Sequence, residues 1–419
     1  MSVLAQRAET GSVSTTRWVQ LGLALLVMMT ISSPQYVWTL FTKPLAGTTG
    51  ATLPALQVTF TMLIVLQTFF SPVQGWLLDR SSPRLLIALG AGLSGLGWVL
   101  SSYVTGLWSL YLTYGLFCGI GTGIVYVGII GLMVRWFPDR RGFATGLVAA
   151  GYGMGAMFTS FPIASMMESS GYQQTLFTFG IILGIVGVAA ALGLRVPAPD
   201  EVPPAPKTLL VSSGRDTAPR DMLRTPLFWL MFGMMTMMST GGLMVTSNFA
   251  NFARDFGVAD AIVFGMVALP LALTFDRLMN GFTRPFFGWV SDNIGRENTM
   301  GLAFILEGCA IALLIYFREN PLAFVFLSGV VFFGWGEIFS LFPSTLTDSF
   351  GTKHATTNYG FLYMAQGVGS ILGGPVAAMM RESFGSWLPV FAIVIALDVL
   401  TGVLALAVLK PMRARHAGR

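Results

Sequence analysis

The sequence predicts an all-α membrane protein of twelve transmembrane helices in two pseudo-symmetric bundles of six. Hydrophobic residues make up 54% of the 419 positions and charged residues only 10%, and the mean hydropathy is +0.71. A soluble domain carries about 25% charged residues. The apolar runs recur at about 20 residues, the length that a helix needs to cross the hydrocarbon layer of a bilayer. An internal repeat divides the chain into two halves.

The apolar runs place the spans along the chain in order. A stretch rich in proline and charge, without apolar periodicity, separates the sixth run from the seventh. We therefore expect an N-terminal bundle at 1–195, a cytoplasmic linker at 196–225 and a C-terminal bundle at 226–419. The twelve expected spans are 17–42, 53–78, 84–104, 108–136, 141–167, 172–195, 226–251, 260–290, 298–317, 321–343, 358–380 and 386–409.

The repeat is visible as two copies of one motif. SPVQGWLLD at 71–79 returns as RPFFGWVSD at 284–292, and the two copies differ by a constant 213 positions. A serine in the first copy is replaced by Arg284 in the second. The fold therefore does not itself require an arginine at this place.

Lysines and arginines predict the orientation of the chain. With both termini cytoplasmic, eighteen of the 24 lie on the cytoplasmic side and four on the other, while Arg277 and Arg284 fall inside the eighth span. This bias follows the positive-inside rule. The net charge of +5 is thus a topology signal and predicts no nucleic-acid partner. We expect a multi-pass protein of a bacterial inner membrane.

The loop after the second span reads Gly-x-x-x-Asp-Arg-x-x-Pro-Arg, and a degenerate copy follows the eighth span. With two six-helix halves, this pattern resembles the major facilitator superfamily of transporters. The resemblance implies that the first, fourth, seventh and tenth helices line a cavity, which opens to either side by rocking of the halves. It also implies that conformational gating at the cytoplasmic side involves Gly75, Asp79, Arg80, Arg84, Asp292 and Arg296.

Further motifs resemble the oxalate and formate antiporters and the related monocarboxylate transporters. They are QYVW at 35–38, GIVY at 123–126, RWFPD at 135–139, MLRTP at 222–226, NGFTRP at 280–285 and LFPS at 341–344. In the oxalate exchangers an arginine of the eighth helix and a lysine of the eleventh bind the two carboxylates. Arg284 matches that arginine, but Gln366 occupies the lysine position. One fixed positive charge favours a substrate with a single carboxylate.

Arg284 is the residue that we expect to bind the substrate. An arginine in mid-membrane costs about 3 kcal/mol on insertion scales, so it should face a protein cavity and meet an anion. Its planar fork can donate two parallel hydrogen bonds to a carboxylate. A salt bridge with Asp276, or a contact with helix carbonyls, is the alternative. Asn280 and Gln366 could bind substrate oxygens or serve as ordinary helix–helix contacts.

Residues of the first, fourth and tenth spans match pocket positions of the family. They would shape a small, largely apolar box around the acid, although each could instead serve in packing. The residues are Gln35, Tyr36, Trp38, Tyr126, Trp335 and Phe339.

Four acids inside the spans are candidates for carrying a coupling proton. We favour Asp276, which shares a helix with Arg284, and Glu337, which lies on a cavity helix. Glu307 and Asp398 lie on the ninth and twelfth helices, which are peripheral in this fold. For those two acids we expect an interhelical hydrogen bond or a pairing partner.

These residues predict a secondary active transporter of short monocarboxylates such as L-lactate or pyruvate, working by proton symport and alternating access. An oxalate/formate-type anion exchanger, which needs no titrating acid, is the alternative. Isolated cysteines and histidines outside the spans argue against an enzyme. A non-transporting sensor would be expected to carry a long additional cytoplasmic domain. We expect a monomer in the lipid bilayer, with a monocarboxylate and a proton as ligands and with no cofactor or metal.

Overall fold

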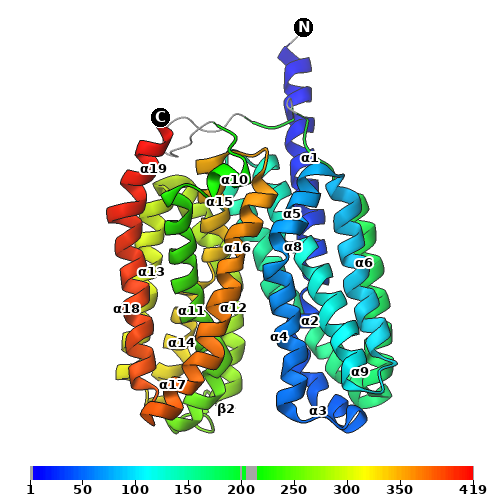
Figure 1. Ribbon diagram of the computed structural model, residues 1–419, viewed down its shortest axis with the longest axis vertical. Helices are drawn as coiled ribbons and strands as arrows, with labels where there is room; N and C mark the ends of the chain where they lie inside the picture. The colour runs from blue at the N-terminus through cyan, green and yellow to red at the C-terminus, as the bar shows by residue number, and fades with distance from the viewer. Residues whose placement is uncertain (1–2, 199–200, 204–214, 419) are drawn as a thin grey trace. The chain divides into compact units, whose positions relative to one another are not determined.

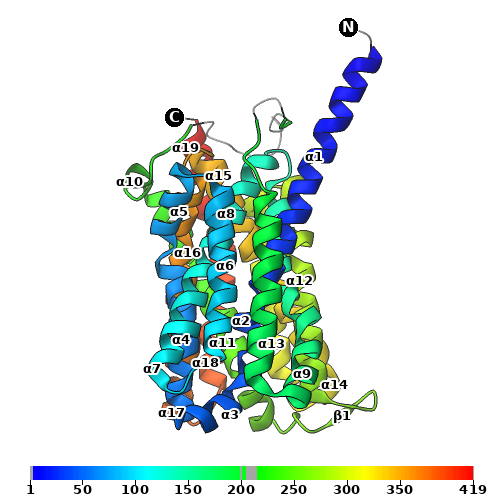
Figure 2. The ribbon, with the colours of Figure 1, turned by 90° about the vertical axis from the view of Figure 1, so that its right-hand side faces the viewer.

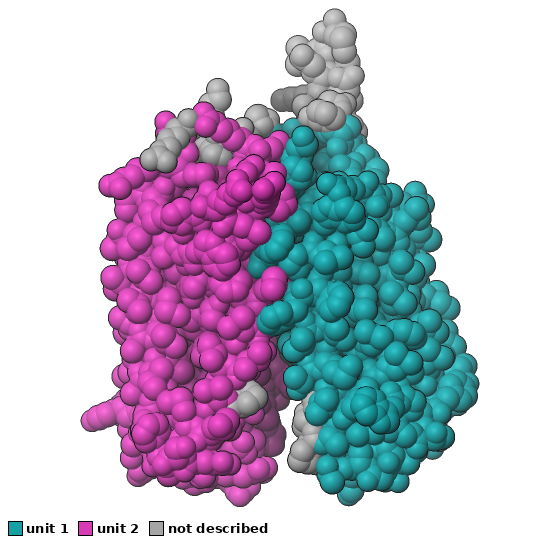
Figure 3. Space-filling model, in the orientation of Figure 1, with its two compact units in different colours: residues 1–139, 147–206, 352–361 teal, residues 140–146, 207–351, 362–419 magenta. Residues whose placement is uncertain are grey.

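The computed structural model describes residues 3–198, 201–203 and 215–418, so the predicted linker lies partly outside the described residues. The described chain is almost entirely helical (Figure 1). It forms two compact units, which Figure 3 shows in teal and magenta. Unit 1 comprises residues 1–139, 147–206 and 352–361, and unit 2 comprises residues 140–146, 207–351 and 362–419. Each unit therefore contains most of one half of the chain and a short segment of the other half.

The first half of the chain forms the helices that predominate in unit 1. They are α1 (Val3–Thr30), α2 (Ser33–Tyr36), α3 (Trp38–Thr49), α4 (Leu53–Phe69), α5 (Ser71–Arg80), α6 (Pro83–Ser101), α7 (Leu107–Leu110), the π-helical η1 (Tyr111–Cys118), α8 (Gly119–Trp136) and α9 (Arg141–Leu192).

The second half forms most of unit 2. Its elements are α10 (Pro219–Met222), α11 (Pro226–Asp255), β1 (Ile262–Val263), β2 (Met266–Val267), α12 (Ala268–Ile294), α13 (Arg296–Tyr316), α14 (Pro321–Trp335), α15 (Ile338–Phe350), α16 (Ala355–Ile371), η2 (Leu372–Val376), α17 (Ala377–Phe384), α18 (Leu388–Leu404), η3 (Ala405–Leu409) and α19 (Lys410–Ala417).

These elements follow the predicted spans closely. By length and apolar composition, 8 helical segments of the described chain can cross a membrane, and two bent pairs of helices raise this number to 10. The other two predicted spans are also helical, in the first part of α9 and in α12. Within α12, Asp276, Arg277, Arg284 and Asp292 lower the apolar character. The predicted all-α architecture is confirmed.

Several predicted spans begin, end or bend differently from the expectation. The first reaches Thr49 instead of residue 42 and bends by 54° before α3. The second bends by 45° between α4 and α5, at Phe70. Pro72 follows this bend, and a proline has no N–H to bond to the carbonyl four residues earlier. α9 runs through the expected fifth and sixth spans, but Gly171 interrupts it with φ 79°, between the two predicted ranges.

The expected start of the eighth span at residue 260 is wrong. Residues 262–267 instead form an antiparallel hairpin in which Ile262 pairs with Val267 and Val263 with Met266. The two turn residues, Phe264 and Gly265, have φ of 50° and 77°, as a tight two-residue hairpin requires. α12 begins immediately after the hairpin. Figure 2 shows β1 at the same end of unit 2 as α14.

The tenth span is broken at Gly336 and Glu337, between α14 and α15. In a continuous helix the Glu337 N–H would bond to the carbonyl of Phe333. That carbonyl instead accepts a hydrogen bond from the Thr283 hydroxyl of α12. A Cβ on Gly336 would lie 2.7 Å from the Asn280 carbonyl oxygen, so glycine allows the close approach of the break to α12.

Candidate functional site

Arg284 lies on α12 with only 2% of its surface exposed. Its Nη2 donates a 2.7 Å hydrogen bond to Asn280 Oδ1, one turn earlier on the same helix. Its Cζ lies 4.5 Å from the ring centroid of Phe339 on α15, which is cation–π distance. The structure thus brings together three of the predicted substrate-binding residues.

Aromatic rings extend this neighbourhood within unit 2. The indole of Trp335, at the end of α14, meets Phe339 edge-on at 5.9 Å and Phe332 at 6.1 Å. On α11 a Cβ added to Gly242 would overlap the Trp335 indole, so only glycine fits there without displacing the ring. Phe339 therefore lies beside the guanidinium and Trp335 packs against Phe339.

Gln366 lies on α16 and is 8% exposed. Its amide oxygen has no hydrogen-bond partner among the described residues. A buried amide oxygen without a partner carries a desolvation cost of about 1–3 kcal/mol. Gln366 thus has acceptor capacity that a ligand could use.

In unit 1 the predicted polar and aromatic residues meet around Tyr152 of α9. The Tyr152 hydroxyl donates to Gln35 Oε1 and lies 3.3 Å from Gln67 Oε1. The ring of Tyr152 packs edge-on against Tyr36 at 5.6 Å and Tyr126 at 5.3 Å. These five residues form what we call the Tyr152 cluster.

Tyr152 and Gln67 were not among the predicted site residues. A signal for Tyr152 exists in the sequence, because Gly153 and Gly155 match Gly367 and Gly369 at an offset of 214. The same offset aligns Tyr152 with Gln366, which was predicted as a site residue.

Trp38 lies in the hydrophobic core of unit 1, whereas Tyr36 belongs to the Tyr152 cluster. Trp38 is 2% exposed, and its ring lies 4.7 Å from that of Tyr114. The Tyr114 hydroxyl in turn donates a 2.7 Å hydrogen bond to the Pro34 carbonyl. These contacts give Trp38 a packing role at the turn between α2 and α3.

The four intramembrane acids fall into two groups. Asp276 on α12 lies beside Ser328 of α14 and its own neighbour Arg277. Glu307, Glu337 and Asp398 are each 0% exposed. Their charges interact with one another, and that of Glu337 also interacts with Arg284.

The sequence placed Glu337 on a cavity helix and did not predict its interaction with Arg284, and it separated Glu307 and Asp398 from Glu337. Those two acids were expected to have a hydrogen-bonding or pairing partner. No oxygen of either carboxyl has a hydrogen-bond partner in the described chain. Their charged neighbours are the other acids of the group.

Of the predicted gating residues in the first copy of the motif, Asp79 contacts the first turn of α16 and Arg135 of α8. Its Oδ2 accepts hydrogen bonds from Thr357 N at 2.8 Å and Thr357 Oγ1 at 2.6 Å, and its Oδ1 pairs with Arg135 at 2.5 Å. A Cβ on Gly75 would lie 2.5 Å from the Thr356 carbonyl oxygen. These contacts, all within unit 1, join α5 to the first turn of α16.

The other first-copy residues, Arg80 and Arg84, lie at the surface. The Arg80 guanidinium lies 4.2 Å from the ring centroid of Trp76, and Arg84 is exposed. In the second copy Asp292 accepts hydrogen bonds from the N–H groups of Gly142 and Phe143, at 3.0 and 2.9 Å.

Arg296 links the second copy to α15. It is fully buried and donates 2.5 Å and 2.9 Å bonds to Asp292 and Asp348. Asp348 also pairs with Arg141. Both copies of the motif thus hold a helix end contributed by the other half of the chain.

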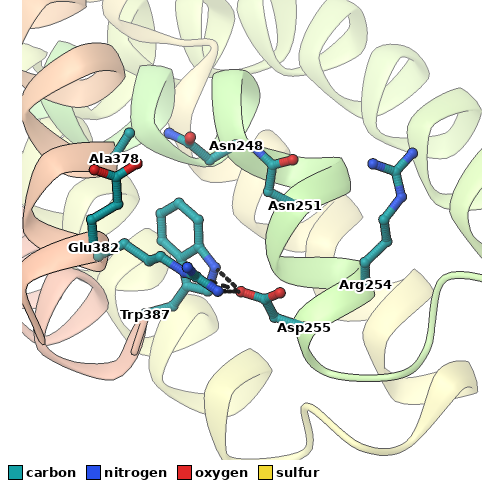
Figure 4. A pocket seen from close by; sticks show the side chains of 8 residues that line it. Asn248, Asn251, Arg254, Asp255, Ala378, Glu382 and Trp387 are labelled. Atoms are coloured by element: carbon teal, nitrogen blue, oxygen red, sulfur yellow. Dashed lines mark hydrogen bonds and ion pairs between the residues drawn. The ribbon is translucent and has the colours of Figure 1, made fainter. Parts of the chain in front are cut away.

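A separate pocket of about 270 Å³ lies at one end of unit 2 (Figure 4). Asp255 accepts hydrogen bonds there from Arg381 at 2.7 Å and from the Trp387 indole at 2.8 Å. Arg254 and Glu382 also line it. Two arginines and two acids balance in charge, so this pocket does not favour an anion, and none of the predicted site residues lines it.

Comparison with known proteins agrees with this arrangement of helices. The profile of the family described as "Major Facilitator Superfamily" matches residues 21–279 and 271–419. The chain is 34% identical over 397 residues to the oxalate:formate antiporter of Oxalobacter formigenes, covering 94% of this chain and 92% of that protein.

Two further relatives are more distant. The uncharacterized MFS-type transporter YhjX of Escherichia coli (strain K12) is 26% identical, over 85% of this chain and 86% of its own. Monocarboxylate transporter 13 of Bos taurus is 25% identical, over 81% of this chain and 77% of its own. All three relatives are named as transporters.

Proposed function

This chain belongs to the Major Facilitator Superfamily and is a multi-pass integral membrane protein, and from this premise we propose that it exchanges small carboxylate anions across the membrane. The observation that carries the proposal is the buried guanidinium of Arg284, held by Asn280 and Phe339. A planar fork in a water-poor site suits a carboxylate. The relative with 34% identity, named an oxalate:formate antiporter, supports exchange as the mode of transport.

Gln366 favours substrates with one carboxylate. An amide cannot neutralise a second anionic group as a lysine would, but it can bond to a hydroxyl, keto or carboxyl oxygen. We therefore place formate and short monocarboxylates ahead of oxalate as substrates of this chain.

Proton symport of a monocarboxylate such as L-lactate or pyruvate is the second candidate. The observation that favours it is the interaction of Glu337 with Arg284. One anion and one proton moving together carry no net charge, so a single arginine and a single acid suffice.

Transport into liposomes distinguishes these modes. We expect labelled formate, L-lactate or oxalate to enter liposomes only when an unlabelled carboxylate is inside, and we expect Arg284→Gln to abolish this uptake. Uptake into empty liposomes that requires an inward proton gradient and stops with a protonophore would replace exchange by symport. If none of these acids entered either the preloaded liposomes or the empty liposomes with a proton gradient, carboxylate transport would be refuted.

We also propose that the protein acts as a monomer in a bacterial inner membrane, with both termini cytoplasmic. The excess of lysines and arginines on one side supports this orientation. Cysteines introduced at Lys353 and Arg318 should then react with an impermeant maleimide from opposite sides of the membrane. Labelling of both from the same side of intact cells would contradict the topology.

A further inference from the structure

Three acids from distant parts of the second half meet inside unit 2. Glu307 comes from α13, Glu337 from the break between α14 and α15, and Asp398 from α18. α13 packs along both α14 and α18, and Figure 1 shows α13 and α18 side by side. The contacts are close, because a Cβ on Gly334 would lie 2.7 Å from Glu307 Cβ and one on Gly241 would lie 2.9 Å from Asp398 Oδ1. We call Glu307, Glu337 and Asp398 the acid cluster.

No hydrogen bond from another described residue reaches the six carboxyl oxygens of the acid cluster. All three side chains are fully buried. An ionised carboxylate buried without a partner costs several kcal/mol, and like charges side by side add to that cost. Protons offset both costs, so the acid cluster is a place where protons bind. No group of three His, Cys, Asp or Glu in the described residues is arranged to hold a metal ion.

Arg284 is the cation that faces this cluster. It interacts with Glu337 from α12, whereas α13 and α18 contribute the other two acids. α11 also packs here, but its only charged residues, Arg254 and Asp255, line the pocket in Figure 4. Besides its burial and its own backbone N–H, the charges that act on Glu337 are those of its fellow acids and of Arg284.

We propose that Glu307, Glu337 and Asp398 form a proton-binding site that takes up a proton when a carboxylate anion binds to Arg284. The guanidinium favours an ionised Glu337. A bound anion neutralises the guanidinium, and Glu337 then shares the buried site only with other acids and binds a proton. The anion on Arg284 and the proton on Glu337 together add no net charge. By linkage, the proton strengthens anion binding by the same factor.

This inference rests on the proposed role of Arg284 as the anion site, but not on exchange or symport as the mode of transport. In exchange each anion would cross together with a proton, and in symport the same site would carry the coupling proton. Asp276, which lies beside Ser328 and Arg277, is not a member of the site.

The test is calorimetric titration of the full-length protein in detergent with formate, L-lactate or oxalate. Repeating the titration in buffers with different heats of ionisation gives the number of protons taken up per bound anion. We expect about one proton near neutral pH for the wild type, since one anion is neutralised by one proton. Glu337→Gln should lower this number by at least half. Glu319→Gln changes an acid in a different region whose side chain is 79% exposed and should leave the number unchanged.

Glu307→Gln and Asp398→Asn provide independent variants in case Glu337→Gln does not fold. Infrared difference spectra upon anion binding should show a protonated carboxyl C=O band that weakens in each folded variant. Binding of an anion to the wild type without proton uptake would overturn the inference and leave the proposed function intact. An unchanged proton number in all the cluster variants would also overturn it. Failure of every acid to bind would instead count against the proposed function.

Discussion

The guanidinium of Arg284 is oriented by its own unit before any ligand arrives. Asn280 holds Nη2, and Phe339 lies beside the charged plane. Fixing a long side chain in advance lowers the entropy cost of binding. The repeat provides a comparison, because Ser71 at the matching position simply donates a 2.8 Å hydrogen bond to the Gln67 carbonyl of its own chain segment. The second copy of the motif has thus gained a group that reaches from α12 toward α15.

Arg284→Lys should weaken carboxylate binding although the charge remains. An ammonium cannot form the two parallel bonds of a guanidinium, and one charge-assisted hydrogen bond is worth about 1.5–3 kcal/mol. We expect the concentration for half-maximal uptake to rise roughly ten- to a hundredfold. Arg277→Lys, on the exposed side of the same helix, is the matched control and should behave as wild type. Equal affinities for Arg284→Lys and wild type would mean that the fork does not contact the substrate.

At the level of elements, the break between α14 and α15 positions two residues of the candidate site, the acid Glu337 and the aromatic Trp335. It interrupts the helix at Glu337 and leaves Trp335 at the end of α14. The Thr283 hydroxyl bonds to the carbonyl that a straight helix would use, and Gly336 permits the close approach to α12. On the other side, Gly242 of α11 makes room for the Trp335 indole.

Gly242→Ala should therefore disturb the site without changing any polar group. The added methyl would overlap the indole of Trp335, which is packed between Phe332 and Phe339. Overpacking of this kind costs about 1–3 kcal/mol. We expect a lower temperature of thermal unfolding in detergent and weaker carboxylate binding.

Gly233→Ala is the matched control for this substitution. It lies on the same helix, and a Cβ there would meet nothing within 4 Å. It should unfold at the wild-type temperature or slightly above, because alanine favours a helix over glycine by about 1 kcal/mol. If Gly242→Ala unfolded like Gly233→Ala, the packing of Trp335 against α11 would have to be looser than the structure shows.

At the scale of the whole molecule, each compact unit incorporates a helix end from the other half of the chain. Residues 352–361 belong to unit 1 and residues 140–146 to unit 2. Asp79 holds the first segment through Thr357, and Asp292 holds the second through the N–H groups of Gly142 and Phe143. The two aspartates are equivalent in the repeat. In the alternating-access cycle that the family resemblance implies, these bonds would break and re-form.

Asp79→Asn should weaken the attachment of residues 352–361 to α5. An asparagine loses the ion pair with Arg135 and accepts from Thr357 more weakly than a carboxylate, because charge-assisted hydrogen bonds are about twice as strong as neutral ones. We expect hydrogen exchange of the peptide that contains Thr357 to accelerate about tenfold or more. Asp260→Asn, at an exposed position, should leave that peptide unchanged. Unaltered hydrogen exchange in Asp79→Asn would show that the close packing of Gly75 against Thr356 holds this segment in place without the carboxylate.

The sequence by itself determined the membrane class, the two halves, the family and Arg284 as the outstanding buried cation. Each of these is encoded locally, in apolar runs, in motif spacing or in one charge inside an apolar helix. Only the tertiary structure brought Glu307 and Asp398 to Glu337, Tyr152 to Gln35, and residues 140–146 and 352–361 into the opposite units. The physical reason is that apolar periodicity tells which residues share a helix, whereas the neighbours of a helix depend on how its side chains and glycines fit against other helices. Glu307 and Asp398 therefore looked peripheral along the chain, although in the fold their charges interact with that of Glu337.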